Sequence, residues 1–163
     1  MIDEINAHLD ALKLRKIREI IPGELKAALS GKPAYSSFLL NLLRQEHEDK
    51  RRRSIAHRVE QAGLPERWTL ETYPFHIQPC VNKKQHQEFA GLDFIGRAEN
   101  IIWMGGTGCG KTGLATSFLI QAIHQGARGR YVLFADLLYE LHRSQADRSQ
   151  NRVIRRYLQY DLL

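Results

Sequence analysis

Cysteine is scarce in this 163-residue chain, which has two of them, Cys80 and Cys109. Two cysteines form neither a disulfide framework nor a metal-binding pattern. Cys109 also lies inside a glycine-rich turn, which a disulfide would obstruct. We therefore expect the protein to work in a reducing compartment, the cytoplasm.

Long apolar runs are missing as well. No uninterrupted run reaches the length that spans a membrane, and the N-terminus does not have the pattern of a signal peptide, so we expect no membrane partner. Repeats and low-complexity tracts are also absent. The apolar fraction of 43% suffices for the core of one domain with an appendage, and the net charge of +6 favours polyanionic partners.

Glycine, in contrast, is concentrated in residues 105–112, which read GGTGCGKT and fit the pattern G-x-x-x-x-G-K-[ST]. An apolar run at 101–104 precedes the glycines, and a helical pattern at 112–125 follows them. This order predicts the strand, glycine loop and helix of a phosphate-binding loop. Glycines let the backbone turn tightly and aim its N–H groups inward, and the helix N-terminus adds further donors.

The loop pattern also assigns roles to individual side chains. Lys111 is placed to reach the β and γ phosphates of a nucleotide, and the hydroxyl of Thr112 is placed to ligate Mg²⁺. The predicted nucleotide-binding residues are Gly105, Gly106, Thr107, Gly108, Cys109, Gly110, Lys111, Thr112 and Gly113.

An overlapping pattern is the alternative. Residues 108–113 also read G-x-G-x-x-G, the fingerprint of dinucleotide-binding proteins, which needs an acidic residue about 20 positions further on. The next acidic residue after the loop is the more distant Asp136, and Lys111 would have no role in that site. The phosphate-loop interpretation is therefore favoured.

The first third of the chain has helical spacing of its apolar residues. We predict a helix over residues 2–21 that ends at Pro22-Gly23, a short helix over 24–29, and a long helix from Ser36 to Ala62.

The long helix carries a basic segment. Between Arg44 and Arg58 there are six basic and three acidic residues, and four consecutive basic residues cover a whole helical turn. Such a turn attracts a phosphate backbone independently of base sequence, and arginine suits phosphate geometry. A solvated charged face is the alternative. The predicted DNA contacts are Lys50, Arg51, Arg52, Arg53 and Arg58.

The remaining segments complete the expected order of elements. Residues 64–82 interleave aromatic residues with three prolines, which predicts an extended linker packed on the following domain. Next we predict a helix over 82–90, a strand over 130–135, a helix capped by Asp136, and a helix over 151–159. Three arginines of this last helix, Arg152, Arg155 and Arg156, suit a solvated face better than a ligand site.

The chain resembles the N-terminal part of IstB-like transposition helper ATPases, which are AAA+ proteins related to DnaC-like helicase loaders. The resemblance rests on residues 12–14, 37–39 and 69–71, on the glycine loop, and above all on 92–100, LDFIGRAEN. It implies an α/β fold with a helical DNA-binding domain at 1–63 and a linker at 64–81. Residues 82–163 would then form the first, incomplete part of a P-loop AAA+ domain with a three-layer parallel sheet.

The resemblance also implies a function. Such helpers bind ATP and Mg²⁺, form homo-oligomers on double-stranded DNA when full length, and deliver a transposase to target sites. A helicase loader, or a DNA-binding remnant without ATPase activity, would be compatible with the same residues.

No catalytic residue is assigned. The family's Walker B strand would begin near residues 161–163, so its two acids lie beyond this chain, and we expect poor ATP hydrolysis or none. The strands predicted at 101–104 and 130–135 would also lack neighbours, for which we expect marginal stability.

Overall fold

The computed structural model describes residues 2–78, 81–146 and 148–163, so Cys80 lies outside the described residues. The chain divides into two compact units, Met1–Ser54 and Ile55–Leu163. This division falls within the long helix α3, Tyr35–Gln61, whereas the sequence-based domain ended at residue 63. Within the described ranges, no helix is both long enough and apolar enough to cross a membrane.

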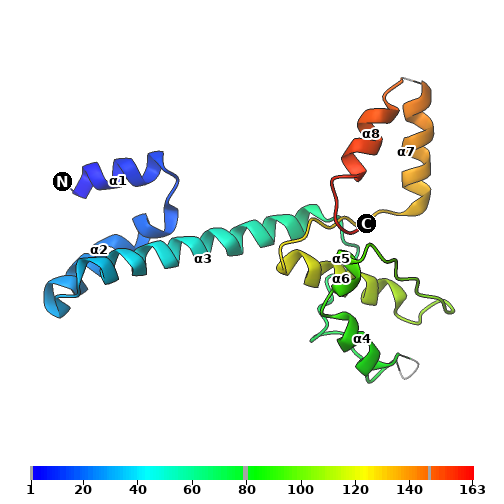
Figure 1. The fold of residues 1–163 in the computed structure, drawn as a ribbon, viewed down its shortest axis with the longest axis horizontal. Coiled ribbons are helices and arrows are strands. Elements are labelled where there is room, and N and C mark those ends of the chain that lie inside the picture. Colours follow the sequence, from blue (N-terminus) through cyan, green and yellow to red (C-terminus); the bar gives the residue numbers. More distant parts are fainter. Residues whose placement is uncertain (1, 79–80, 147) are drawn as a thin grey trace. The chain divides into compact units, whose positions relative to one another are not determined.

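Three helices form the first unit: α1 (Ile2–Ala11), α2 (Arg15–Gly31) and the first part of α3 (Figure 1). Apolar residues recur at helical spacing and meet in one small core. The buried members of this core are Leu9, Ile17, Ile21 and Leu42.

The prediction of one helix over residues 2–21 that ends at Pro22-Gly23 was wrong. The chain breaks instead after α1, where Lys13 adopts a left-handed φ of 58° and the N–H of Leu14 bonds back to the carbonyl of Leu9. Pro22 lies inside α2, which also absorbs the separate short helix predicted at 24–29. Burial of Ile17 and Ile21 on α2 outweighs the local cost of the interior proline.

A carboxylate on α3 accepts a hydrogen bond from the first turn of α2. Leu14, which precedes α2, makes no side-chain capping bond. The buried carboxylate of Glu46 instead accepts a hydrogen bond from the N–H of Ile17 at 3.0 Å, and Arg53 donates to its second oxygen at 3.4 Å. One of the free donors at the helix N-terminus is thus satisfied across the core rather than by a local residue.

Helix α6 (Lys111–His124) is the centre of the second unit. It is apolar on most of its circumference and is buried accordingly. Two core clusters contact it, one through Phe118 and Ala122 and the other through Leu119 and Ile123. The other helices of this unit are α4 (Lys83–Phe89), α5 (Asp93–Gly96), α7 (Phe134–Ala146) and α8 (Gln150–Tyr157).

The predicted helices over 36–62, 82–90, 112–125 and 151–159 are therefore confirmed, apart from small shifts of their ends. Residues 93–96, between the predicted helix at 82–90 and the predicted strand at 101–104, form the short helix α5. One local prediction was wrong: Asp136 does not cap α7, because α7 begins at Phe134 and Asp136 lies in its first turn.

The predicted sheet is not seen in the described part of the chain. Residues 101–104 form no strand, although their side chains still alternate, with Ile101 and Trp103 packed on the core and Ile102 and Met104 exposed. Because the segment has no neighbouring strand, it makes no ladder of backbone hydrogen bonds, and only the alternation of packed and exposed side chains remains.

The second predicted strand, 130–135, was also wrong in its extent, because residues 134 and 135 belong to α7. Its start makes one isolated parallel bridge, between Gly129 and Leu162, with the N–H of Arg130 bonded to the carbonyl of Leu162 at 3.0 Å. The next N–H, that of Tyr131, bonds to the carbonyl of Ala62, so the ladder does not continue.

Replacing Glu46 by Ala should lower the free energy of unfolding of the first unit by about 1–3 kcal/mol, because the N–H of Ile17 loses its buried acceptor. Faster amide hydrogen exchange in residues 15–24, followed by mass spectrometry, would report the loss. The matched control is Glu48→Ala on the exposed side of α3. Equal exchange in both variants would contradict the capping role.

Candidate nucleotide-binding loop

The glycine loop ends where α6 begins. Gly108 and Gly110 adopt left-handed φ angles of 81° and 75°, which a residue with a side chain rarely adopts. The first helical hydrogen bond runs from the N–H of Leu114 to the carbonyl of Gly110 at 3.0 Å. The N–H groups of residues 111–113 precede this bond, so they are the donors that a helix leaves for an anion, at the positive end of its dipole.

The side chain of Lys111 turns back over the loop. Its Nζ donates to the carbonyls of Gly106 at 2.6 Å and Gly105 at 3.0 Å. The ammonium is therefore already held beside the backbone that would surround a phosphate group. Thr112, the predicted magnesium ligand, is exposed at the next position.

A cavity of about 470 Å³ opens on the loop. One wall consists of loop and α6 residues, Thr107, Gly108, Gly110, Lys111, Thr112 and Gly113; the other consists of Glu66, Trp68, Tyr73, Pro74 and Gln78. The first wall supplies backbone N–H groups and an ammonium. The second supplies the rings of Trp68, Tyr73 and Pro74, together with the carboxylate of Glu66 and the amide of Gln78. These donors fit a nucleotide, with phosphates at the loop and room for the ribose and base beside the aromatic wall.

The second wall belongs to the linker, which packs on the loop but runs through turns at 70–72 and 75–77 instead of the predicted extended chain. The hydroxyl of Tyr73 donates to the carbonyl of Gly110 at 3.3 Å, and the amide of Gln78 donates to the carbonyl of Gly108 at 3.1 Å. Burial raises the pKa of the Tyr73 phenol, and nearby Cys109 and Glu66 raise it further, so the hydroxyl keeps its proton at neutral pH. Two loop carbonyls are thereby occupied by hydrogen bonds from the linker.

The close approach of the linker explains two glycines. A Cβ at Gly110 would lie 1.9 Å from the hydroxyl of Tyr73, and a Cβ at Gly113 would lie 3.1 Å from the Tyr73 ring and 3.2 Å from Trp68. Gly113 does not adopt a left-handed φ, so glycine is favoured at this position by the nearby rings of Tyr73 and Trp68 and not by the backbone conformation. The sequence did not identify Trp68, Tyr73 or Gln78 as site residues, because no fixed spacing connects the linker to the loop.

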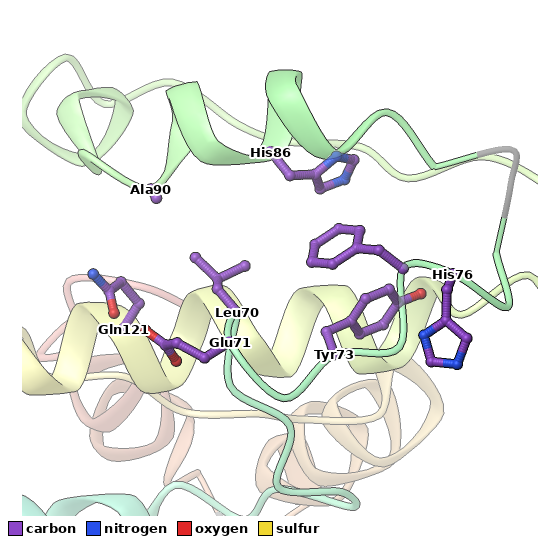
Figure 2. Close-up of a pocket in the computed structure, with 8 residues that line it drawn as sticks. Leu70, Glu71, Tyr73, His76, His86, Ala90 and Gln121 are labelled. Carbon is purple, nitrogen blue, oxygen red and sulfur yellow. The ribbon is translucent and has the colours of Figure 1, made fainter.

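A second cavity of about 650 Å³ adjoins the first and shares Tyr73 with it. Figure 2 shows His86 of α4 and Ala90, which follows α4, on one side of this cavity, with Leu70 and Tyr73 of the linker facing them across it. Aromatic contacts continue from Tyr73 through Phe75 to His86, with ring centroids 4.8 and 6.3 Å apart. This row of rings joins the linker to α4 and keeps Tyr73 in place beside the loop.

Metal ligands are sparse. Among the residues that the structure describes, no three side chains of His, Cys, Asp or Glu gather into a metal-binding cluster. Mg²⁺ in nucleotide sites is held by few protein ligands and mostly by phosphates and water, so the single hydroxyl of Thr112 is compatible with the predicted role.

The predicted DNA contacts on α3 differ in their surroundings. Arg52 donates to the carboxylate of Asp49 at 2.6 Å, and Arg53 donates to Asp49 at 2.7 Å as well as to Glu46. These bonds from Arg53 and Arg52 hold the pKa of Asp49 below its usual value. Lys50 and Arg51 are exposed beside them, and no carboxylate pairs with either within the described ranges.

Arg58, the fifth predicted contact, belongs to the second unit. Its guanidinium donates to the carbonyl of Gly126, just after α6, at 2.9 Å. Arg130 donates in the same region to the carbonyl of Gln61 at 2.6 Å. Arg58 and Arg53 therefore bond to other parts of the fold, whereas Lys50 and Arg51 have no carboxylate partner among the residues that the structure describes.

Replacing Gly113 by Ala should lower the free energy of unfolding of the second unit by about 1–3 kcal/mol, because the rings of Tyr73 and Trp68 must shift to admit a methyl group. Urea unfolding followed by tryptophan fluorescence measures the change. Gly96→Ala is the control, since nothing lies within 4 Å of its added Cβ. A Gly113→Ala midpoint equal to that of the control would show that the rings do not constrain this position.

Comparison with known proteins agrees with these features. The family model described as "IstB-like ATP binding protein" matches residues 7–163. The chain is 31% identical over 163 residues to the "Insertion sequence IS5376 putative ATP-binding protein" of Geobacillus stearothermophilus, covering 100% of this chain and 65% of that protein. It is 33% identical over 156 residues to the "Insertion sequence IS21 putative ATP-binding protein" of Pseudomonas aeruginosa, covering 96% of this chain and 58% of that protein.

A third relative, the "Insertion sequence IS21-like putative ATP-binding protein" of Bacteroides fragilis (strain YCH46), is 30% identical over 152 residues, with 93% of this chain and 76% of that protein covered. The chain spans less than two thirds of the length of the first two relatives.

Proposed function

The chain belongs to the family of IstB-like ATP-binding proteins, and from this premise we propose that it binds ATP and Mg²⁺ at residues 105–113 as part of an insertion-sequence helper. The observation that carries the proposal is the position of Lys111, whose ammonium lies on the carbonyls of the loop directly before the free N–H groups of α6.

In this proposal each part of the loop has one task. The N–H groups of residues 111–113 donate to phosphate oxygens, and the ammonium of Lys111 moves from the loop carbonyls to the β and γ phosphates. Thr112 contributes its hydroxyl to Mg²⁺, which neutralises phosphate charge when bound. No residue of this chain is proposed to activate water.

Replacing Lys111 by Ala should weaken ATP binding at least about tenfold, because a charge-assisted hydrogen bond to phosphate is lost. Titration with a fluorescent ATP analogue in the presence of Mg²⁺ measures the dissociation constant. Lys84→Ala removes the same charge from an exposed position on α4 and should leave the constant unchanged. Equal affinities for the wild type and both variants would exclude the loop as the site.

The second part of the proposal concerns DNA. Homologues are named for insertion sequences, and the basic turn of α3 presents Lys50 and Arg51 without carboxylate partners among the described residues. We propose that the intact protein forms homo-oligomers on double-stranded DNA through this turn and assists a transposase. Arg53 serves the fold in this proposal, because it holds Glu46 and Asp49.

Replacing Lys50 and Arg51 together by Gln should weaken binding to duplex DNA of any sequence. The slope of log affinity against log salt concentration should become less steep by about 2, because two phosphate contacts are lost. Fluorescence anisotropy at several salt concentrations measures both. Arg15→Gln with Lys26→Gln on α2 removes the same charge elsewhere in the unit; if the two double variants bind DNA alike, the turn is only a solvated face.

A further inference from the structure

Helices α7 and α8 form an antiparallel hairpin whose two members pack side by side (Figure 1). A groove of about 540 Å³ runs between them. Arginines dominate its lining, which consists of Glu140, Arg143, Ser144, Ser149, Arg152, Val153, Arg155, Arg156 and Gln159.

The arginines that α8 contributes to this lining recur at helical spacing in the sequence. Within α8, Arg155 and Arg156 follow Arg152 by three and four residues, so the three arginines lie on one face of the helix. Gln159, which also lines the groove, follows the end of α8. Arg143 of α7 lines the groove opposite them. No acidic residue occurs between residues 148 and 160, so α8 brings no negative charge of its own to this face.

One arginine of the groove is neutralised within the hairpin. The guanidinium of Arg156 pairs with the carboxylate of Glu140, which also accepts a hydrogen bond from the hydroxyl of Tyr157 at 2.7 Å. The bonds from Arg156 and Tyr157 hold the pKa of Glu140 below its usual value. This pair holds α8 against α7. It also neutralises Glu140, the carboxylate that lines the groove.

The other three arginines have no such neutralisation. In the part of the chain that the structure describes, no carboxylate pairs with Arg143, Arg152 or Arg155. Like charges facing one groove repel one another, and a negatively charged ligand relieves this repulsion. The solvated-face interpretation of α8 explains exposed arginines, but it does not explain their convergence with Arg143 on a shared groove.

We propose that this groove is a second nucleic-acid contact, which binds the phosphate backbone through Arg143, Arg152 and Arg155. Arginine forks pair with phosphate oxygens bidentately. Arg152 and Arg155 are separated by about 4.5 Å along the helix axis, which is comparable with the axial spacing of about 3.4 Å between charges along one strand of DNA, so their long side chains can reach neighbouring phosphates of that strand. The inference rests on the proposed DNA-binding function and adds a contact that is independent of α3.

The test compares duplex DNA binding by the wild-type chain, by Arg152→Gln with Arg155→Gln, and by a control with Arg67→Gln and Lys84→Gln. The control removes the same charge from exposed positions outside the groove and outside α3. Arg156 is left intact because it holds Glu140. At about 0.1 M salt the groove variant should bind about tenfold more weakly or worse, and its salt slope should be less steep by about 2. The control should keep more affinity and a slope closer to that of the wild type.

Each outcome decides something. If the wild type binds DNA and the groove variant matches the control, the groove contact is refuted while the proposed function stands. If the wild type does not bind DNA, both fail.

Amide hydrogen exchange supplies a second readout that needs no variant. DNA should protect residues 148–158, and binding without this protection refutes the contact. Polyglutamate of equal charge concentration should compete poorly, and equal competition would reassign the groove to acidic proteins.

Discussion

The close contact between the linker and the glycine loop is the constraint on which the second unit depends. The ring and hydroxyl of Tyr73 lie so near the backbone that Gly110 and Gly113 have no space for a side chain. The same residue bonds to a loop carbonyl, lines both cavities and starts the row of aromatic contacts that reaches α4. The loop is therefore shaped from two directions, by its own glycines and by a segment more than thirty residues earlier in the chain.

Features that depend on residues close together in the sequence were predicted, whereas features that depend on contacts between distant residues were not. The loop, α6 and most other helices were predicted because spacing within a dozen residues determines them. The end of a helix at Pro22 was predicted wrongly because packing of Ile17 and Ile21 overrides a local preference. The partners of the loop were missed for the same reason, since contacts between the linker and the loop leave no periodic signal. The strands predicted at 101–104 and 130–135 are not confirmed, because a strand forms only beside a partner strand, and the sequence had already indicated that these two segments would lack neighbours.

Charge in this protein is divided between side chains that serve the fold and side chains that remain open to a ligand. Arg53, Arg58 and Arg156 each bond to a carboxylate or carbonyl of the chain itself. Four other basic side chains have no carboxylate partner within the described ranges, namely Lys50, Arg51, Arg152 and Arg155. Composition alone gave a net charge of +6 and could not separate these groups. The ion pairs and hydrogen bonds do, because they identify basic side chains that are held within the fold.

The parallel bridge between Gly129 and Leu162 brings together the two ends of the segment that contains α7 and α8. The N–H of Arg128 also bonds to the carboxylate of Asp161 at 2.7 Å, which closes the base of the hairpin more firmly. Once such a loop is closed, its conformational entropy changes only with the logarithm of its length. A change in the length of the α7–α8 hairpin should therefore change the closure entropy little, and it would leave the glycine loop, which lies on separate elements, as it is.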